Sequence, residues 1–98
     1  MPDRYCVKLM SRALRDLDEI YAENLSEPKT AENMLDSLEK GIYSLETLPY
    51  RCSERKIGAY ANKGYRQLFV KRYTIVFRID EDTKTVIIVT VRYSPSQF

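Results

Sequence analysis

Apolar residues recur at two different spacings along the chain, and this change predicts the order of its elements. Residues 5–10 (YCVKLM) alternate as in a short strand. Steps of three and four then predict two helices, over residues 12–24 and 27–47, with Gly41 suggesting a close approach between them. The predicted apolar stripes are Leu14, Leu17, Ile20, Tyr21 and Leu25 in the first helix, and Ala31, Met34, Leu35, Leu38, Ile42 and Leu45 in the second. Their short connection predicts an antiparallel hairpin.

The second half of the chain has the pattern of strands. Residues 49–64 (PYRCSERKIGAYANKG) are a loop by composition. Three strands are predicted over 65–70, 73–80 and 85–93, and their short connections require antiparallel neighbours. The order βααβββ predicts the α+β class, as a single domain over residues 1–98 with an antiparallel sheet and a helical hairpin packed on one face.

Alternation sorts the strand residues onto two faces of the sheet. If the turn at 71–72 pairs Val70 with Tyr73, then Arg66 faces Phe77. The predicted core face carries Leu68, Val70, Tyr73, Ile75, Phe77 and Ile79, with Ile87, Val89, Val91 and Tyr93 from the last strand. The opposite, uncovered face carries Tyr65, Gln67, Phe69, Thr74, Val76, Arg78 and Arg92. Arginines beside aromatic rings suit an RNA surface, although they also suit a solvated strand.

Charge is divided unevenly along the sequence. Residues 1–54 hold seven Lys/Arg and 11 Asp/Glu, a balance of −4, whereas residues 55–98 hold nine Lys/Arg and three Asp/Glu, a balance of +6. This favours a basic binding face in the second half, or a chance division of surface charge. There is no histidine, and Cys6 and Cys52 are not in a CxxC motif, so we expect no metal site and no cofactor. Without a signal peptide or a membrane-length apolar run, we expect a cytoplasmic protein with no membrane partner.

Four segments, in this order and over nearly the whole chain, resemble the RelE/ParE superfamily of bacterial type II toxin–antitoxin toxins. YCVKLMSRALRDLDEIY resembles the opening strand and helix, and AENMLDSLEKGIYSLETLPYRC resembles the second helix. GYRQLFVKRYTIVFRID resembles the family segment Gly-x-Arg-x-Leu-x-Val-x-x-Tyr-x-Ile, and VIIVTVRY resembles the closing strand.

The resemblance implies a toxin that a cognate antitoxin neutralises, in a homodimer or a toxin–antitoxin hetero-oligomer. RelE-type members enter the ribosome and cleave mRNA, with the message's own 2′-OH as nucleophile. ParE-type members inhibit DNA gyrase and are not nucleases. A weakened toxin that retains antitoxin binding is a third interpretation. We expect the basic sheet and its adjoining surface to receive an acidic, partly disordered antitoxin tail.

RelE-type chemistry needs a base, cations at the phosphate and a proton donor. The candidate catalytic residues are Arg66 by motif, Arg78 by face, and Arg92 and Tyr93 on the closing strand; the candidate nucleic-acid-binding residues are Lys63, Tyr65, Lys71 and Arg72. Tyr93 also suits a core position, and Arg66 could instead pair with a helix carboxylate. The ending SPSQF lacks the family's usual histidine or basic tail, and a pI of about 8.5 is low for a ribosome-binding nuclease, so both features weaken the nuclease interpretation.

Overall fold

The computed structural model describes residues 4–94 of the chain. Its elements, in chain order, are β1 (Cys6–Leu9), α1 (Ser11–Glu23), α2 (Pro28–Tyr43), the 3₁₀ helices η1 (Ser44–Glu46) and η2 (Pro49–Arg51), β2 (Arg66–Val70), β3 (Tyr73–Asp80) and β4 (Thr85–Tyr93). The predicted order and the α+β class are confirmed. The second helix ends four residues before its predicted limit of 47, because the chain tightens into 3₁₀ geometry ahead of Pro49, as helix ends commonly do.

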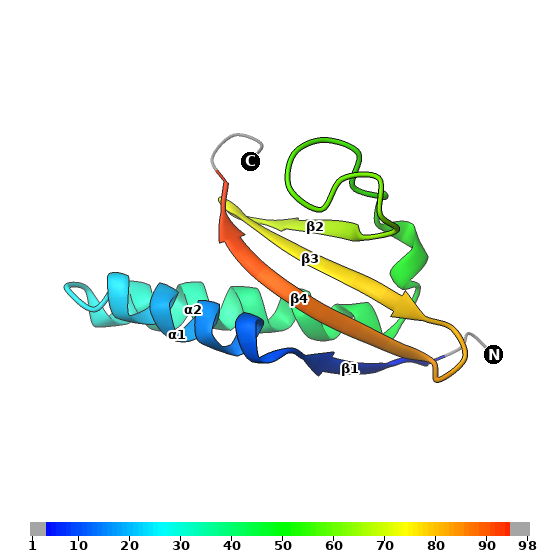
Figure 1. The fold of residues 1–98 in the computed structure, drawn as a ribbon. Coiled ribbons are helices and arrows are strands. Elements are labelled where there is room, and N and C mark those ends of the chain that lie inside the picture. Colours follow the sequence, from blue (N-terminus) through cyan, green and yellow to red (C-terminus); the bar gives the residue numbers. More distant parts are fainter. Residues whose placement is uncertain (1–3, 95–98) are drawn as a thin grey trace.

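The four strands form one sheet in the order β1-β4-β3-β2, and both helices cover the same face of it (Figure 1). β1 runs parallel to β4, with Cys6 opposite Thr85 and Leu9 opposite Ile88. The sheet is therefore mixed rather than wholly antiparallel as predicted. The physical reason is that the helical hairpin follows β1 and carries the chain to the far edge, so β1 can enter beside the last strand instead of beside β2.

The register of β2 and β3 is as predicted, with Val70 opposite Tyr73 and Arg66 opposite Phe77. In β4, however, Phe77 faces Ile88 while Val76 faces Thr90, so Val89 is the extra residue of a β-bulge. The bulge reverses the alternation within one strand. The residues that reach the core are consequently Val86, Ile88 and Val91, and the assignment of Ile87 and Val89 to the core was wrong.

The buried face of helix α1 is shifted from its predicted apolar stripe, of which Ile20 is buried and Leu17 packs against the core. Its buried residues are Ala13, Asp16 and Ile20, whereas Leu14 and Leu25 are about half exposed. In α2 the predicted Ala31, Leu38 and Ile42 are buried. The close approach at Gly41 is to the sheet rather than to α1, since a Cβ there would lie 2.7 Å from Val70 Cγ2.

The face of the sheet away from the helices is covered in part, which corrects the prediction of an open surface; Phe69 and Arg78 on this face remain exposed. Thr74 and Val76 lie on that face and are fully buried. The segment 53–64 lies beside β2 and away from the helices (Figure 1), and Glu54 forms an antiparallel bridge with Arg66. Arg55, only 2% exposed, fixes it there, since its Nη1 donates to Gln67 Oε1 at 2.8 Å and its Nε donates to the Ala59 carbonyl.

Residues 4–94 hold neither a membrane-spanning helix nor a metal-binding cluster. No helix there has the length and apolar character needed to cross a membrane. Within the same range, histidine, cysteine and acidic side chains form no group of three or more that could hold a metal ion.

Candidate functional site

Arg66 lies at the start of β2, on the helix-facing side that its register predicts. Its Nη1 donates to the Cys52 carbonyl at 2.6 Å, and its guanidinium carbon lies 5.0 Å from the centre of the Tyr50 ring. The side chain is half-buried between these groups. Arg66 is therefore held by a backbone carbonyl and an aromatic face, and not by the helix carboxylate considered above.

Arg92 and Tyr93 lie at the C-terminal end of β4, opposite Thr74 and Tyr73. As consecutive strand residues they point to opposite faces. Arg92 is half-buried near Arg55, whose pKa is lowered by burial and then by the positive charge of Arg92. Tyr93 is on the core-facing side, as its alternation suggested, but it is 57% exposed at the rim, where its ring packs edge-on against Tyr73 with 5.5 Å between centroids.

The other predicted site residues are spread over the surface. Arg78 is exposed on β3, Lys71 and Arg72 are exposed in the β2–β3 turn, Lys63 is exposed in the loop, and Tyr65 is half-buried against Tyr60. Arg66 and Arg92 face positions 77 and 74 of β3. Three residues along the strands, ~10 Å, and two strand spacings across the sheet, also ~10 Å, separate them, and they lie on opposite faces. The four candidate catalytic residues thus do not converge on one site.

The structure assembles a cluster that the sequence did not indicate, made of Glu81, Tyr5, Tyr50 and Lys84. The Tyr50 and Tyr5 hydroxyls donate to Glu81 Oε2 at 2.7 and 2.9 Å, and Lys84 Nζ donates to Oε1. Hydrogen bonds from Lys84, Tyr50 and Tyr5, in that order, lower the pKa of Glu81 to about 2. The hydrogen bond to Glu81 is the largest cause that raises the pKa of Tyr50, whereas burial is the largest for Tyr5. This Glu81 cluster ties the β3–β4 turn to the N-terminal strand and to η2.

The Glu81 cluster predicts a pH-dependent stability. The pKa of Glu81 is about 2 in the folded chain against an ordinary 4.5, so its contribution is complete above pH 4.5 and is lost as the pH falls through 2. We expect Glu81→Gln to lower the melting temperature by a constant amount above about pH 5, and by a shrinking amount between pH 4.5 and 2. Thermal unfolding followed by circular dichroism across this range measures it.

The neighbouring exposed carboxylate at Asp82 supplies the control. No hydrogen bond or ion pair of the Asp82 side chain is found among residues 4–94, so Asp82→Asn should show no comparable pH-dependent difference. A Glu81→Gln difference that persists undiminished at pH 2 would contradict this account of the cluster.

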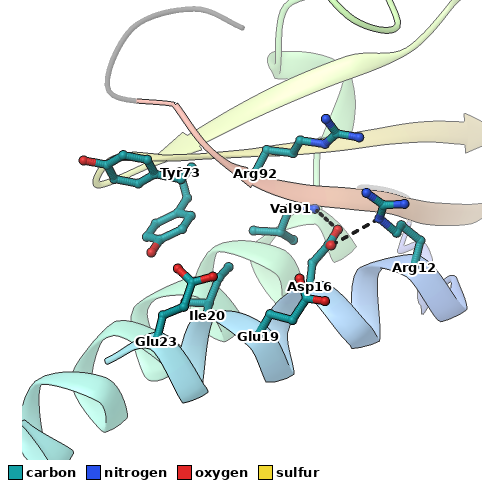
Figure 2. Close-up of a pocket in the computed structure, with 9 residues that line it drawn as sticks. Arg12, Asp16, Glu19, Ile20, Glu23, Tyr73, Val91 and Arg92 are labelled. Carbon is teal, nitrogen blue, oxygen red and sulfur yellow. Dashed lines mark hydrogen bonds and ion pairs between the residues drawn. The ribbon is translucent and has the colours of Figure 1, made fainter. Parts of the chain in front are cut away.

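A second assembly is the cleft between α1 and the end of β4, with a volume of about 230 Å³. Its lining residues are Arg12, Asp16, Glu19, Ile20 and Glu23 from α1, with Tyr73, Val91, Arg92 and Tyr93 from the strands (Figure 2). Asp16, 8% exposed, accepts hydrogen bonds from Val91 N–H at 3.1 Å, from the Thr90 hydroxyl and from Arg12 Nε at 3.3 Å. Burial is the main cause that raises the pKa of Tyr73, and the charge of Glu23 adds to it.

Three solved structures of proteins from toxin–antitoxin systems share this fold. The chain is similar to a chain of the chromosomal ParDE toxin–antitoxin system from P. aeruginosa (TM-score 0.76, 19% identity, 93% of this chain and 97% of that one). It is also similar to a chain of the RelBE2 complex from Mycobacterium tuberculosis (TM-score 0.67, 22% identity, 96% and 95% covered). A mutant of the E. coli toxin RelE in the free state is a more distant neighbour (TM-score 0.59, 12% identity, 90% and 81% covered).

The sequence itself decides the family. Residues 7–97 match the model of the ParE toxin of type II toxin–antitoxin systems, parDE. The chain belongs to the ParE toxin family. It is therefore a type II toxin, and the predicted place in the RelE/ParE superfamily is confirmed. No curated protein sequence matches the chain significantly. The Glu81 cluster and the α1–β4 cleft are thus features of a ParE-family toxin, and neither was indicated by the sequence, because each joins residues far apart in the chain.

Proposed function

We propose that this ParE-family toxin inhibits growth by occupying DNA gyrase, without catalysing a reaction, and that a cognate antitoxin neutralises it. The observation that carries the proposal is the separation of Arg66, opposite Phe77 of β3, from Arg92 and Tyr93, opposite Thr74 and Tyr73 of the same strand. Cleavage of RNA requires a base, a proton donor and phosphate-binding cations within hydrogen-bonding reach of one scissile bond. A toxin that acts by occupancy needs only a complementary surface.

The pKa shifts favour the same mechanism. Glu81, with a pKa of about 2, is a weak base at neutral pH, and the pKa values of Tyr5, Tyr50 and Tyr73 are raised, which makes these phenols poorer proton donors. Burial likewise raises the pKa of Cys52, which makes its thiolate harder to form. These groups are therefore not tuned for acid–base work near pH 7.

Family membership supports both the target and the antitoxin. The matching family is that of ParE toxins, and a structural neighbour comes from a ParDE toxin–antitoxin system. For the ParE branch of the superfamily, the resemblance implies inhibition of gyrase. For every branch, it implies an antitoxin partner.

Controlled expression in bacteria separates gyrase inhibition from RNA cleavage. Under the proposal, induction arrests growth and triggers a DNA damage response while mRNA stays intact, and the purified toxin inhibits supercoiling by gyrase in vitro. Co-expression of the adjacent antitoxin gene restores growth.

Two arginine variants make the assay decisive. Arg66→Ala is compared with Arg15→Ala, which alters an exposed arginine on α1 away from the sheet. Position-specific mRNA cuts that vanish in Arg66→Ala but persist in Arg15→Ala would establish RelE-type cleavage instead. Full growth during induction, with the antitoxin still bound, would establish a weakened toxin.

A further inference from the structure

The segment that contains η2 lies at the end of the molecule opposite the α1–α2 connection (Figure 1), and there it lines an apolar pocket. This Tyr5–Tyr50 pocket has a volume of about 380 Å³ and is lined by Tyr5, Leu48, Pro49, Tyr50 and Arg51. Leu48 and Tyr50 are 64% and 50% exposed, although both side chains are large and largely apolar. A pocket of this size, with apolar walls and a few polar groups, is typical of a binding site.

The backbone at Leu48 is held in a conformation that leucine rarely adopts. Its φ of 49° and ψ of 50° lie in the left-handed region, which the Cβ atom disfavours. Pro49 adds to the strain, because proline favours an extended residue before it. Arg51 stabilises this backbone, since its Nη1 donates to the carbonyls of Thr47 at 2.7 Å and Leu48 at 3.0 Å. Strain of this kind is concentrated at functional sites, and here the strained residue carries a mostly exposed apolar side chain.

The aromatic wall of the Tyr5–Tyr50 pocket is fixed by the Glu81 cluster. The two rings pack edge-on with 6.4 Å between centroids, and both hydroxyls donate to Glu81. Lys84 Nζ lies 5.3 Å from the centre of the Tyr5 ring, and the guanidinium carbon of Arg66 lies 5.0 Å from that of Tyr50. The pocket is therefore preorganised, so binding costs little further ordering of its side chains.

The surroundings of the pocket are positively charged. The carboxylates of Glu81 and Glu46 each have a cationic partner. Arg51 and Arg66 donate instead to backbone carbonyls, and no ion pair of either arginine is found among residues 4–94. Burial raises the pKa of Cys52 most, and the charges of Arg51 and Arg66 oppose it, so both cations lie near the same side chain. Their charge favours a partner that places a carboxylate beside an apolar side chain.

We propose that the Tyr5–Tyr50 pocket is the surface through which the toxin occupies gyrase, and that it receives a large apolar side chain of gyrase flanked by an acidic residue. The apolar side chain packs against Leu48 and the two rings, and the carboxylate lies near the charges of Arg51 and Arg66. A rigid pocket with one anchor suits a folded target, whereas a partly disordered antitoxin segment wraps an extended surface. This inference rests on the proposed function, from which gyrase comes.

Leu48→Asn tests the pocket, because asparagine adopts the left-handed conformation more readily than leucine and lacks the apolar side chain. We expect the toxin concentration that halves DNA supercoiling by purified gyrase to rise about tenfold or more, while the melting temperature stays at or above the wild-type value. The control Ile57→Asn changes an apolar side chain of the same 64% exposure in segment 53–64. It should leave the inhibitory concentration within about twofold of wild type.

A second pair of variants tests the charge. Arg66→Gln removes the charge but keeps a donor for the Cys52 carbonyl, and Arg15→Gln makes the same change in net charge at an exposed position of α1. Arg66→Gln should raise the inhibitory concentration about fivefold and weaken its dependence on salt, because salt screens the attraction between opposite charges. Arg15→Gln should match the wild type in both measurements.

The outcomes separate this site from the proposed function. If the wild type inhibits gyrase and Leu48→Asn inhibits it equally, the docking site is wrong and the function stands. If Leu48→Asn still inhibits gyrase but no longer binds the antitoxin, the pocket belongs to the antitoxin and the proposed occupant is wrong. If inhibition and the melting temperature of Leu48→Asn fall together, Leu48 serves the fold, and the docking site is again wrong. If the wild type does not inhibit gyrase, this site and the gyrase part of the proposed function both fail.

Discussion

Asp16→Ala is expected to lower the free energy of unfolding by about 3 kcal/mol, because it leaves buried hydrogen-bond donors without an acceptor. Each buried donor that loses its partner costs about 1–3 kcal/mol. The carboxylate accepts from the backbone N–H of Val91 and the hydroxyl of Thr90, and Thr90 is fully buried. It also holds Arg12 at 3.3 Å. Alanine supplies none of these acceptors. Chemical denaturation in urea, followed by circular dichroism, measures the loss.

Asp18→Ala is the matched control for this prediction. It removes the same group from the same helix, but Asp18 is exposed and no hydrogen bond or ion pair of its side chain is found among residues 4–94, so the change should stay within about 0.5 kcal/mol. Asp16→Asn retains one acceptor oxygen and should fall between the two. Equal losses for Asp16→Ala and Asp18→Ala would show that the edge of β4 does not depend on this carboxylate.

Arg55→Ala is expected to lower the free energy of unfolding by about 2 kcal/mol, since it leaves at least two acceptors without their donor. Gln67 Oε1 and the Ala59 carbonyl lose hydrogen bonds from a guanidinium that is 2% exposed. Segment 53–64 then keeps its backbone hydrogen bonds to Tyr65 and Gln67 but loses this attachment, and the buried Thr74 and Val76 gain access to water. Trypsin should cut after Lys56 and Lys63 faster than in the wild type.

Two further variants define what Arg55 contributes. Arg55→Lys keeps the charge but cannot reach both acceptors with one planar group, so it should recover only part of the loss. Arg72→Ala removes an exposed arginine at the β2–β3 turn and should leave both the stability and the tryptic pattern of the loop unchanged. Stability and tryptic cleavage that stay at wild-type values in Arg55→Ala would mean that the loop is held by other contacts.

The periodicity of apolar residues along the chain predicted much of the fold. The alternation of apolar and polar residues on either side of the turn at 71–72 predicted the register of β2 and β3 correctly. With a two-residue turn, only one pairing of the two strands puts the apolar residues of both on the same face of the sheet. The same reasoning failed in β4, because one extra residue at Val89 reverses the alternation and neither its type nor its neighbours mark a bulge.

Prediction from the sequence was wrong where a polar side chain contacts residues that are distant along the chain. Asp16 looks like a surface carboxylate by its spacing, and only its pairing with Val91, 75 residues away, explains its burial. Arg55 was missed for the same reason, since a guanidinium in a loop looks solvated until Gln67 is placed beside it. Glu81 gathers Tyr5 from 76 residues away, a contact that no local pattern encodes. Motifs and the alternation of side chains between the two faces therefore predicted the strands better than they predicted which polar residues lie together.

The parallel pairing of β1 with β4 also sets an order on folding during synthesis. Residues Cys6–Leu9 leave the ribosome first, yet their partners, Thr85 to Ile88, are translated only after every other strand has been made. Such a long loop closes late and at an entropic cost, so the nascent chain carries a helical hairpin with no completed sheet to pack against. A premature stop codon anywhere before residue 85 should consequently yield a fragment without β4, unable to fold and harmless to the cell that made it.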